Sequence, residues 1–300
     1  MAVAALPPID LRLLYQILTH IPGVETVCAE EKIASELYKQ LKKAGFEARK
    51  KYKEQKIKVD RAELEKRIAR SQYLIDFKSI EIDGKWLERL FKEYLLILKR
   101  SQEENAKLFE KLEQGFKQSQ LDLEALVKKV FCFDSGYLEA LARRLTLKTE
   151  DLFFLGFWLG NPVFELYAGK LKEKIDSDGW LKGYCPVCGS SPTMAYLRKD
   201  DGKRILWCQF CGTKWSFLRL KCPFCSNEDQ KTLRYFYTDE NDPYRVYVCD
   251  KCKKYVKTID QRKLTGENDL DLVWENLDTS ALDFVAQKDG YSTLAAWFEV

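Results

Sequence analysis

Two cysteines separated by two residues occur in each of four stretches, YCPVCGS (184–190), WCQFCGT (207–213), KCPFCSN (221–227) and VCDKCKK (248–254). A C-x-x-C pair forms a tight turn from which both sulfurs reach one metal ion. Two such turns facing each other supply a tetrahedral set of four thiolates. The protein has ten cysteines but a single histidine, His20. A histidine-rich metal site is therefore excluded, and any histidine-based acid–base chemistry would depend on this one residue. We therefore expect the paired cysteines to determine the fold and the chemistry.

The order of the pairs predicts two sites: one of Cys185, Cys188, Cys208 and Cys211, and one of Cys222, Cys225, Cys249 and Cys252. We prefer this sequential pairing because a hairpin between two turns closes only a short loop. Crossed pairing, first turn with third and second with fourth, stays open. Gly189 and Gly212 follow the second cysteine of their turns, where a positive φ is expected. Ser226 and Lys253 take that place in the other two turns, so the second site departs more from the CPxCG form.

Sites closed by four cysteines leave no open position for a substrate, and most such sites hold structural zinc. Redox-active iron and labile thiol chemistry remain alternatives. Cys28 and Cys132 stand outside the pairs, and we interpret each as a small buried apolar residue, with a reactive thiol as the alternative. We assign no role to His20.

The chain is predicted to be α+β, with a helix bundle in residues 1–183. Apolar residues recur at helical spacing, for example Trp86, Leu90, Tyr94 and Leu98. Six to eight helices are expected, including ones near 9–19, 26–46, 59–75, 84–118 (one helix or two), 121–130, 136–145 and 150–174. Ser135 and Thr149 are predicted as N-caps.

The pattern changes near Gly183 to short strand-like runs joined by turns. Hairpins are predicted for 195–198 with 203–207 and for 232–237 with 244–248. Each lies between two cysteine pairs, which indicates an internal duplication: a first module at 184–221 and a second at 222–258. The tail, 259–300, holds nine acidic and three basic residues. We expect a helix there, beginning near Asp278–Ser280, and it contacts either the basic modules or a partner.

The charge and hydropathy of the chain bear on two classes of function, nucleic-acid binding and membrane insertion. Residues 185–258 contain fourteen Lys/Arg and eight Asp/Glu, an excess that two four-thiolate sites would largely neutralise, which weakens a nucleic-acid interpretation. Trp207, Trp215, Tyr235, Tyr237 and Tyr247 are expected to pack the small sheets rather than stack on bases. The N-terminus lacks the features of a signal peptide, and the longest apolar stretch, 152–167, is interrupted by polar residues, Gly and Pro. We expect a cytoplasmic protein, with no membrane insertion and with reduced thiols.

Residues around the cysteines resemble the FdhE family of formate dehydrogenase accessory proteins. The resemblance rests on Tyr184–Ser190 with Pro192, Leu206–Trp215 and Val248–Lys257, and on Ala281-Leu282-Asp283 with Asp289-Gly290-Tyr291 in the tail. It implies a non-catalytic accessory protein that binds the catalytic subunit of respiratory formate dehydrogenase before export. It also implies an α-helical domain followed by two rubredoxin-like modules. Their eight paired cysteines would bind two metal ions, iron or zinc.

Other functions remain open on the residues alone. A tandem zinc-ribbon nucleic-acid-binding protein and a rubredoxin-like electron carrier are the main alternatives. An enzyme that uses Cys28 or Cys132 as a sulfur carrier is a weaker one, because neither a histidine nor a clear carboxylate pair accompanies a nucleophile. We therefore predict that the protein is not an enzyme.

Overall fold

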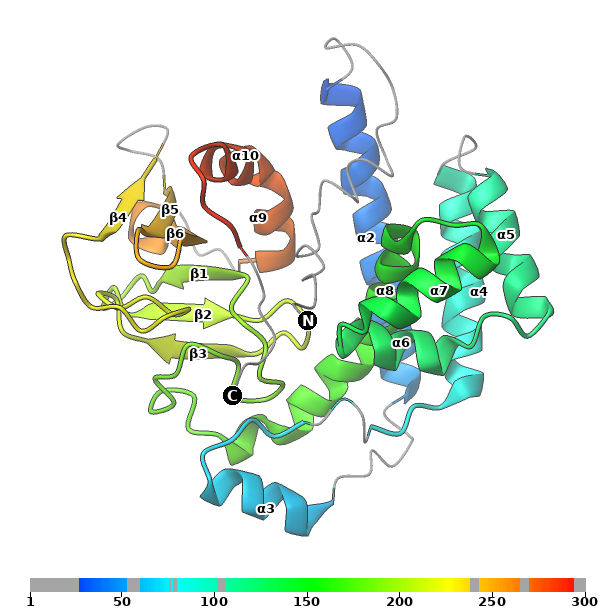
Figure 1. Ribbon diagram of the computed structural model, residues 1–300, viewed down its shortest axis with the longest axis horizontal. Coiled ribbons are helices and arrows are strands. Elements are labelled where there is room, and N and C mark those ends of the chain that lie inside the picture. Colours follow the sequence, from blue (N-terminus) through cyan, green and yellow to red (C-terminus); the bar gives the residue numbers. More distant parts are fainter. Residues whose placement is uncertain are drawn as a thin grey trace. The chain divides into compact units, whose positions relative to one another are not determined.

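The computed structural model describes residues 27–52, 60–75, 77, 80–101, 106–237, 243–264 and 270–293 (Figure 1). Their contacts divide the chain at 168 into two compact units, and 60–75 group with the C-terminal one. The helix predicted near 9–19 and His20 lie outside the described residues. Cys28 belongs to a helix, but its side chain lies outside the described part of the chain. Helices and a sheet occupy separate parts of the sequence, so the predicted α+β class is confirmed.

The helices are α2 (Val27–Tyr52), α3 (Arg61–Ala69), α4 (Gly84–Ser101), α5 (Ala106–Lys117), α6 (Leu123–Phe131), α7 (Ser135–Leu145), α8 (Thr149–Leu171), α9 (Leu272–Asp278) and α10 (Ser280–Lys288), with 3-10 turns at Lys172–Lys174 and Gln261–Lys263. No helix in the described ranges has both the length and the apolar character needed to cross a bilayer. The region predicted as one helix or two at 84–118 forms two, α4 and α5.

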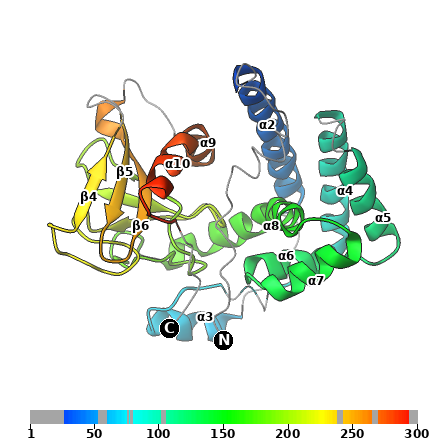
Figure 2. The same cartoon turned by 45° about the horizontal axis from the view of Figure 1, so that its top comes forward.

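The helical unit is built around α8, which packs against α6 (Figure 2). Gly156 and Gly160 allow this close approach, because a Cβ at Gly160 would collide with the Phe131 ring and one at Gly156 would press on Val130. α2 packs on α4, and the Trp86 indole N–H donates to the Ala48 carbonyl at 2.9 Å. The apolar stripe predicted from the sequence therefore faces the core of this unit.

Neither predicted cap stands before its helix. Asp134, not Ser135, caps α7, and its carboxylate accepts a hydrogen bond from the Tyr137 N–H at 3.0 Å. A carboxylate at a helix N-terminus also interacts favourably with the helix dipole, which a serine hydroxyl does not match. Thr149, the other predicted cap, is likewise the first helical residue, that of α8, rather than the residue before the helix.

The second unit contains a six-stranded sheet. Its strands are β1 (Met194–Leu197), β2 (Arg204–Trp207), β3 (Lys214–Phe217), β4 (Leu233–Phe236), β5 (Tyr244–Cys249) and β6 (Lys254–Asp260). The order is β3-β2-β1-β6-β5-β4, so both predicted hairpins form, as β1–β2 and β4–β5. The parallel pairing of β1 with β6 places Met194 opposite Lys257. All other neighbouring strands are antiparallel.

Helices α9 and α10 cover one face of the sheet (Figure 1). Leu282 and Ala286 of α10 pack against Val246 and Tyr255, while Leu272 of α9 packs with residues of β1, β2 and β6. The acidic tail thus contacts the modules of its own chain. The single helix expected there is two helices, and the second begins at Ser280 as predicted.

Residues 60–75 belong to the unit that contains the sheet. The N–H groups of Leu74 and Ile75 donate to the Val187 carbonyl at 2.9 and 2.7 Å. These backbone bonds hold 60–75 on the first cysteine turn, whereas one domain over 1–183 stays a prediction.

Candidate metal centres

All four C-x-x-C turns have the same backbone geometry. The N–H of the residue after the second cysteine donates to the carbonyl of the first: Gly189 to Cys185 (2.8 Å), Gly212 to Cys208 (2.9 Å), Ser226 to Cys222 (3.0 Å) and Lys253 to Cys249 (2.8 Å). The donor residues have φ values of 78°, 71°, 57° and 54° in that order. Positive φ at the two glycines is as predicted. Ser226 and Lys253 adopt the same left-handed conformation, so their substitution for glycine leaves the turn intact.

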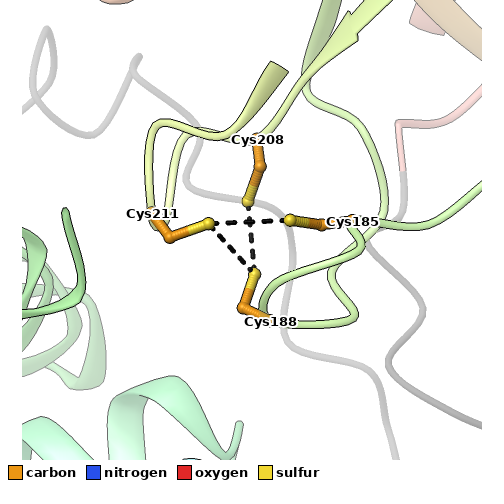
Figure 3. A group of neighbouring side chains, drawn as sticks. All are labelled: Cys185, Cys188, Cys208 and Cys211. Atoms are coloured by element: carbon orange, nitrogen blue, oxygen red, sulfur yellow. Dashed lines mark hydrogen bonds between the residues drawn. The ribbon is translucent and has the colours of Figure 1, made fainter. Parts of the chain in front are cut away.

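The first site, called site 1, gathers the sulfurs of Cys185, Cys188, Cys208 and Cys211 (Figure 3). Cys185 Sγ lies 3.6 Å from Cys211 Sγ. Cys188 Sγ lies 3.5 Å from both Cys208 Sγ and Cys211 Sγ. All four residues are buried. The four side chains point toward one common centre, two from each turn.

The second site, called site 2, gathers Cys222, Cys225, Cys249 and Cys252. Cys222 Sγ lies 3.7 Å from Cys252 Sγ, and Cys225 Sγ lies 3.7 Å from Cys249 Sγ. Cys225 and Cys252 are partly exposed, unlike any cysteine of site 1. The sequential pairing of turns is therefore the one in the structure, and crossed pairing is not.

The donor sets fit a tetrahedral metal ion. Within each group the four sulfurs lie within 4.8 Å of one another. A Zn–S bond of about 2.3 Å in a tetrahedron requires sulfurs about 3.8 Å apart, close to the 3.5–3.7 Å found between neighbouring sulfurs. These eight cysteines are free thiols rather than disulfides. Each group could therefore hold one ion.

The thiols of site 1 cannot all ionise by themselves. Burial, followed by hydrogen bonding to the neighbouring thiols, raises the pKa of Cys188 well above its ordinary value, and burial raises that of Cys211 as well. Burial also opposes ionisation of Cys208, but hydrogen bonds from the other three thiols outweigh it and lower the pKa of Cys208. Cys208 therefore ionises more readily than Cys188 and Cys211, and a bound cation would displace the protons of those two thiols.

In site 2 as well, the pKa is raised for some thiols and lowered for one of them. Burial raises the pKa of Cys222 and raises that of Cys252 to about 11. Burial also acts against ionisation of Cys249, but backbone N–H groups of Cys252 and Lys251 donate to its sulfur and lower its pKa. The turn backbone therefore stabilises thiolate charge on the first cysteine of this pair.

Three polar side chains next to the sulfurs were missed by the sequence analysis. Ser190 Oγ lies 2.9 Å from Cys188 Sγ, and Thr213 Oγ1 lies 3.1 Å from Cys211 Sγ. In site 2 the Asn227 amide donates to Cys249 Sγ at 3.6 Å. All three stand two residues after a second cysteine, and this recurrence is the signal that could have identified them.

The other singled-out residues have different positions. Cys132 ends α6 and is half-buried rather than buried, and it belongs to neither group of four. Trp207 and Trp215 are buried in the sheet as predicted. Tyr235 and Tyr237 are exposed, but the Tyr235 ring lies 5.3 Å from the Tyr247 ring and 6.0 Å from the Tyr237 ring, so these tyrosines pack against one another on the sheet.

Comparisons with known proteins bear on the same region. Residues 184–219 match the family model described as FdhE, central domain. The chain is 37% identical over 142 residues to "Protein FdhE homolog" of Aquifex aeolicus (strain VF5), a match covering 46% of this chain and 48% of that protein. It is 33% identical over 130 residues to "Protein FdhE" of Escherichia coli O1:K1 / APEC, covering 42% of this chain and 40% of that one. The matched part spans about half the length, or less, of these relatives.

A solved structure extends the likeness beyond the matched sequence. The crystal structure of the FdhE protein from Pseudomonas aeruginosa superimposes with a TM-score of 0.62 at 18% sequence identity, and the match covers 96% of this chain and 95% of that one. At this identity the match shows a shared fold. The resemblance carried by the cysteine motifs is therefore confirmed: residues 184–219 match the FdhE central-domain model, and the fold is shared over most of the chain.

Proposed function

We propose that this protein is a non-catalytic accessory protein for the maturation of formate dehydrogenase and that it binds the catalytic subunit of that enzyme in the cytoplasm before export. The observation that carries the proposal is the match of residues 184–219, which contain the site 1 cysteines, to the FdhE central domain, together with 37% identity over 142 residues to the FdhE homolog of Aquifex aeolicus. The fold shared with the FdhE protein of Pseudomonas aeruginosa supports it over the rest of the chain.

The proposal includes two metal ions, iron or zinc. Cys185, Cys188, Cys208 and Cys211 hold one, and Cys222, Cys225, Cys249 and Cys252 hold the other. Four thiolate ligands leave no coordination position for a substrate, so the ions stabilise the sheet rather than catalyse a reaction. The proposal also gives the two sites a role in sensing redox state. Site 2 is the more accessible to an oxidant, because two of its thiols are partly exposed.

Capture of the partner tests the function directly. A tagged, metal-loaded protein is expressed in its native host, and bound proteins are identified by mass spectrometry. We expect enrichment of the formate dehydrogenase catalytic subunit by the wild type and by Cys132→Ser, the matched control outside both groups. Replacement of the four site 2 cysteines by serine should abolish enrichment if this site shapes the binding surface. Failure of the wild type to enrich any formate dehydrogenase subunit would overturn the proposal.

A second measurement separates the alternatives. Protein purified without air is analysed for metal content and absorbance: reversible bleaching of an iron-loaded form would favour the electron carrier, whereas zinc in both sites would exclude it. Binding to nucleic acid is measured between low and high salt. The nucleic-acid alternative requires an affinity that falls steeply with salt, and absence of binding at low salt eliminates it.

A further inference from the structure

A cavity of about 190 Å³ lies beside site 2, between strands of the first and the second module. Arg204 of β2 and Tyr247 of β5 contribute to its wall, and so do Cys222 and Cys249 of site 2. None of the eight sulfurs needs this space, since each four-cysteine group is complete without it.

The wall of the cavity is strongly basic. Five basic residues and no acidic residue line it: Arg204, Arg219, Lys221, Arg234 and Lys254. Lys221 pairs with Glu228 at 2.8 Å, and Arg234 pairs with Asp250 at 2.9 Å. In the described part of the chain, Arg204, Arg219 and Lys254 form no ion pair. Three cations therefore face one small cavity without a carboxylate.

Arg204 is the buried member of this set, with 2% of its surface exposed. Its guanidinium lies over the Tyr247 ring, 4.5 Å from the ring centre, and its Nη1 donates to the Lys221 carbonyl at 3.3 Å. Its Nε is buried and has no hydrogen-bond partner among the described residues. Burial is the largest influence on the pKa of Arg204 and lowers it. A buried charged donor without an acceptor is costly, so the site lacks a group that accepts from Nε.

The thiolates of site 2 neutralise only part of the positive charge in the cavity wall. A loaded four-thiolate site with a divalent ion carries a charge of about −2, against the three unpaired cations of the wall. Its sulfurs attract Arg204 electrostatically, but the hydrogen-bonding potential of Nε stays unfilled. The remaining requirement is one negative charge that brings oxygen acceptors.

We propose that this cavity binds a single oxyanion, a carboxylate or a phosphate group, and that the guanidinium of Arg204, which lines the cavity, holds it. The planar guanidinium fork suits two oxygens of either group, and Arg219 and Lys254 add positive charge to the wall. The site belongs to the sheet itself and does not depend on the proposed formate dehydrogenase partner.

The test uses the full chain with both cysteine groups loaded, as checked by metal analysis. Melting temperature and heat of binding are measured with sodium phosphate alone and with sodium acetate alone, against sodium chloride at the same ionic strength. We expect saturable stabilisation by at least one of the two anions, and the stronger one identifies the group. Arg204→Met should weaken binding on the order of tenfold or more, as loss of a charge-assisted hydrogen bond implies.

Arg198→Gln is the matched control. Arg198 stands on the β1–β2 turn in the same module and pairs with Asp201, outside the cavity, so this variant should bind as the wild type does. If Arg204→Met does not fold, Arg219→Gln at an exposed position replaces it and should weaken binding severalfold. Absence of saturable binding for both anions overturns the proposal, as does binding that is unchanged in the variant used.

Discussion

Lys257 of β6 donates a hydrogen bond to the Asp283 carboxylate of α10 at 2.7 Å, with only 3% of the lysine side chain exposed. The same ammonium donates to the Asn276 carbonyl of α9 at 2.7 Å. One buried lysine in the middle of the sheet therefore binds both C-terminal helices.

Asp283→Asn should lower the free energy of unfolding by about 2 kcal/mol, because it leaves the Lys257 charge buried without its carboxylate. This value is below that of a fully buried pair, since 20% of the Asp283 side chain is exposed. Urea unfolding of the metal-loaded protein measures it. Asp289→Asn, an exposed acid one residue beyond α10, is the control and should be neutral. Equal stability of the two variants would contradict the prediction.

Gly160→Ala should destabilise the helical unit by about 1–3 kcal/mol, as overpacking typically does, because the added methyl group meets the Phe131 ring. Gly169→Ala is the matched control in the same helix. Nothing lies within 4 Å of a Cβ at that position, so the better helix former should stabilise by about 0.5–1 kcal/mol. Thermal unfolding of both variants decides it, and effects of the same sign at the two positions would refute the explanation.

Ser226→Gly should raise stability by up to about 1 kcal/mol, since a left-handed conformation costs an L-residue about that much and Ser226 has φ 57°. Ser226→Ala removes the same hydroxyl without relieving the backbone and should give no gain. Gly212→Ala, in the equivalent turn of site 1 with φ 71°, should lose stability. An equal gain in stability from Ser226→Ala and Ser226→Gly would contradict this, because it would mean that the serine hydroxyl rather than the backbone conformation is responsible.

Metal should leave site 2 before site 1. A chelator reaches the partly exposed Cys225 and Cys252, whereas every cysteine of site 1 is buried. We expect two kinetic phases of equal amplitude when release is followed with a colorimetric chelator, and Cys225→Ser should remove the faster phase only. Loss of the slower phase in that variant would reverse the assignment.

Glu113 should titrate far below an ordinary glutamate. Hydrogen bonds from Lys117 first and Lys99 second hold its pKa at about 2. A lowered folded pKa means that the contribution to stability is complete above the unfolded pKa of about 4.3 and is lost as the pH falls toward about 2. Carboxyl-carbon NMR should show Glu113 titrating well below the ordinary glutamate value of about 4.3, and Lys117→Gln should raise the Glu113 pKa. Titration of Glu113 at the ordinary value would contradict this.

Sequence patterns predicted those parts of the fold that depend on residues close to one another in the chain. The spacing within each cysteine pair, the turn residues between β1 and β2, and the start of α10 at Ser280 were all predictable, since each depends on neighbours within a few residues. The choice of partner turns followed from loop length, because Cys188 and Cys208 are separated by one hairpin.

The parts that could not be predicted depend on contacts between distant residues. The β1–β6 pairing joins Met194 to Lys257 across three of the four cysteine pairs, and a lysine in a strand normally indicates a position that faces solvent. Its burial becomes favourable only once Asp283 and Asn276 are in place. The attachment of 60–75 uses main-chain atoms of Leu74 and Val187, which any residue types would offer.

The sheet consists of two copies of one three-stranded set that run in the same direction, so that β1 corresponds to β4 and β3 to β6. The contact between β1 and β6 therefore joins the first strand of one copy to the third strand of the other, which is a head-to-tail contact. At the β3 edge of the sheet, the Ser216 N–H donates to the Ser177 carbonyl, so this edge already has a backbone partner. At the β4 end, a third copy placed after the second could dock through the same contact that already unites the first two, so the architecture can grow by duplication in one direction.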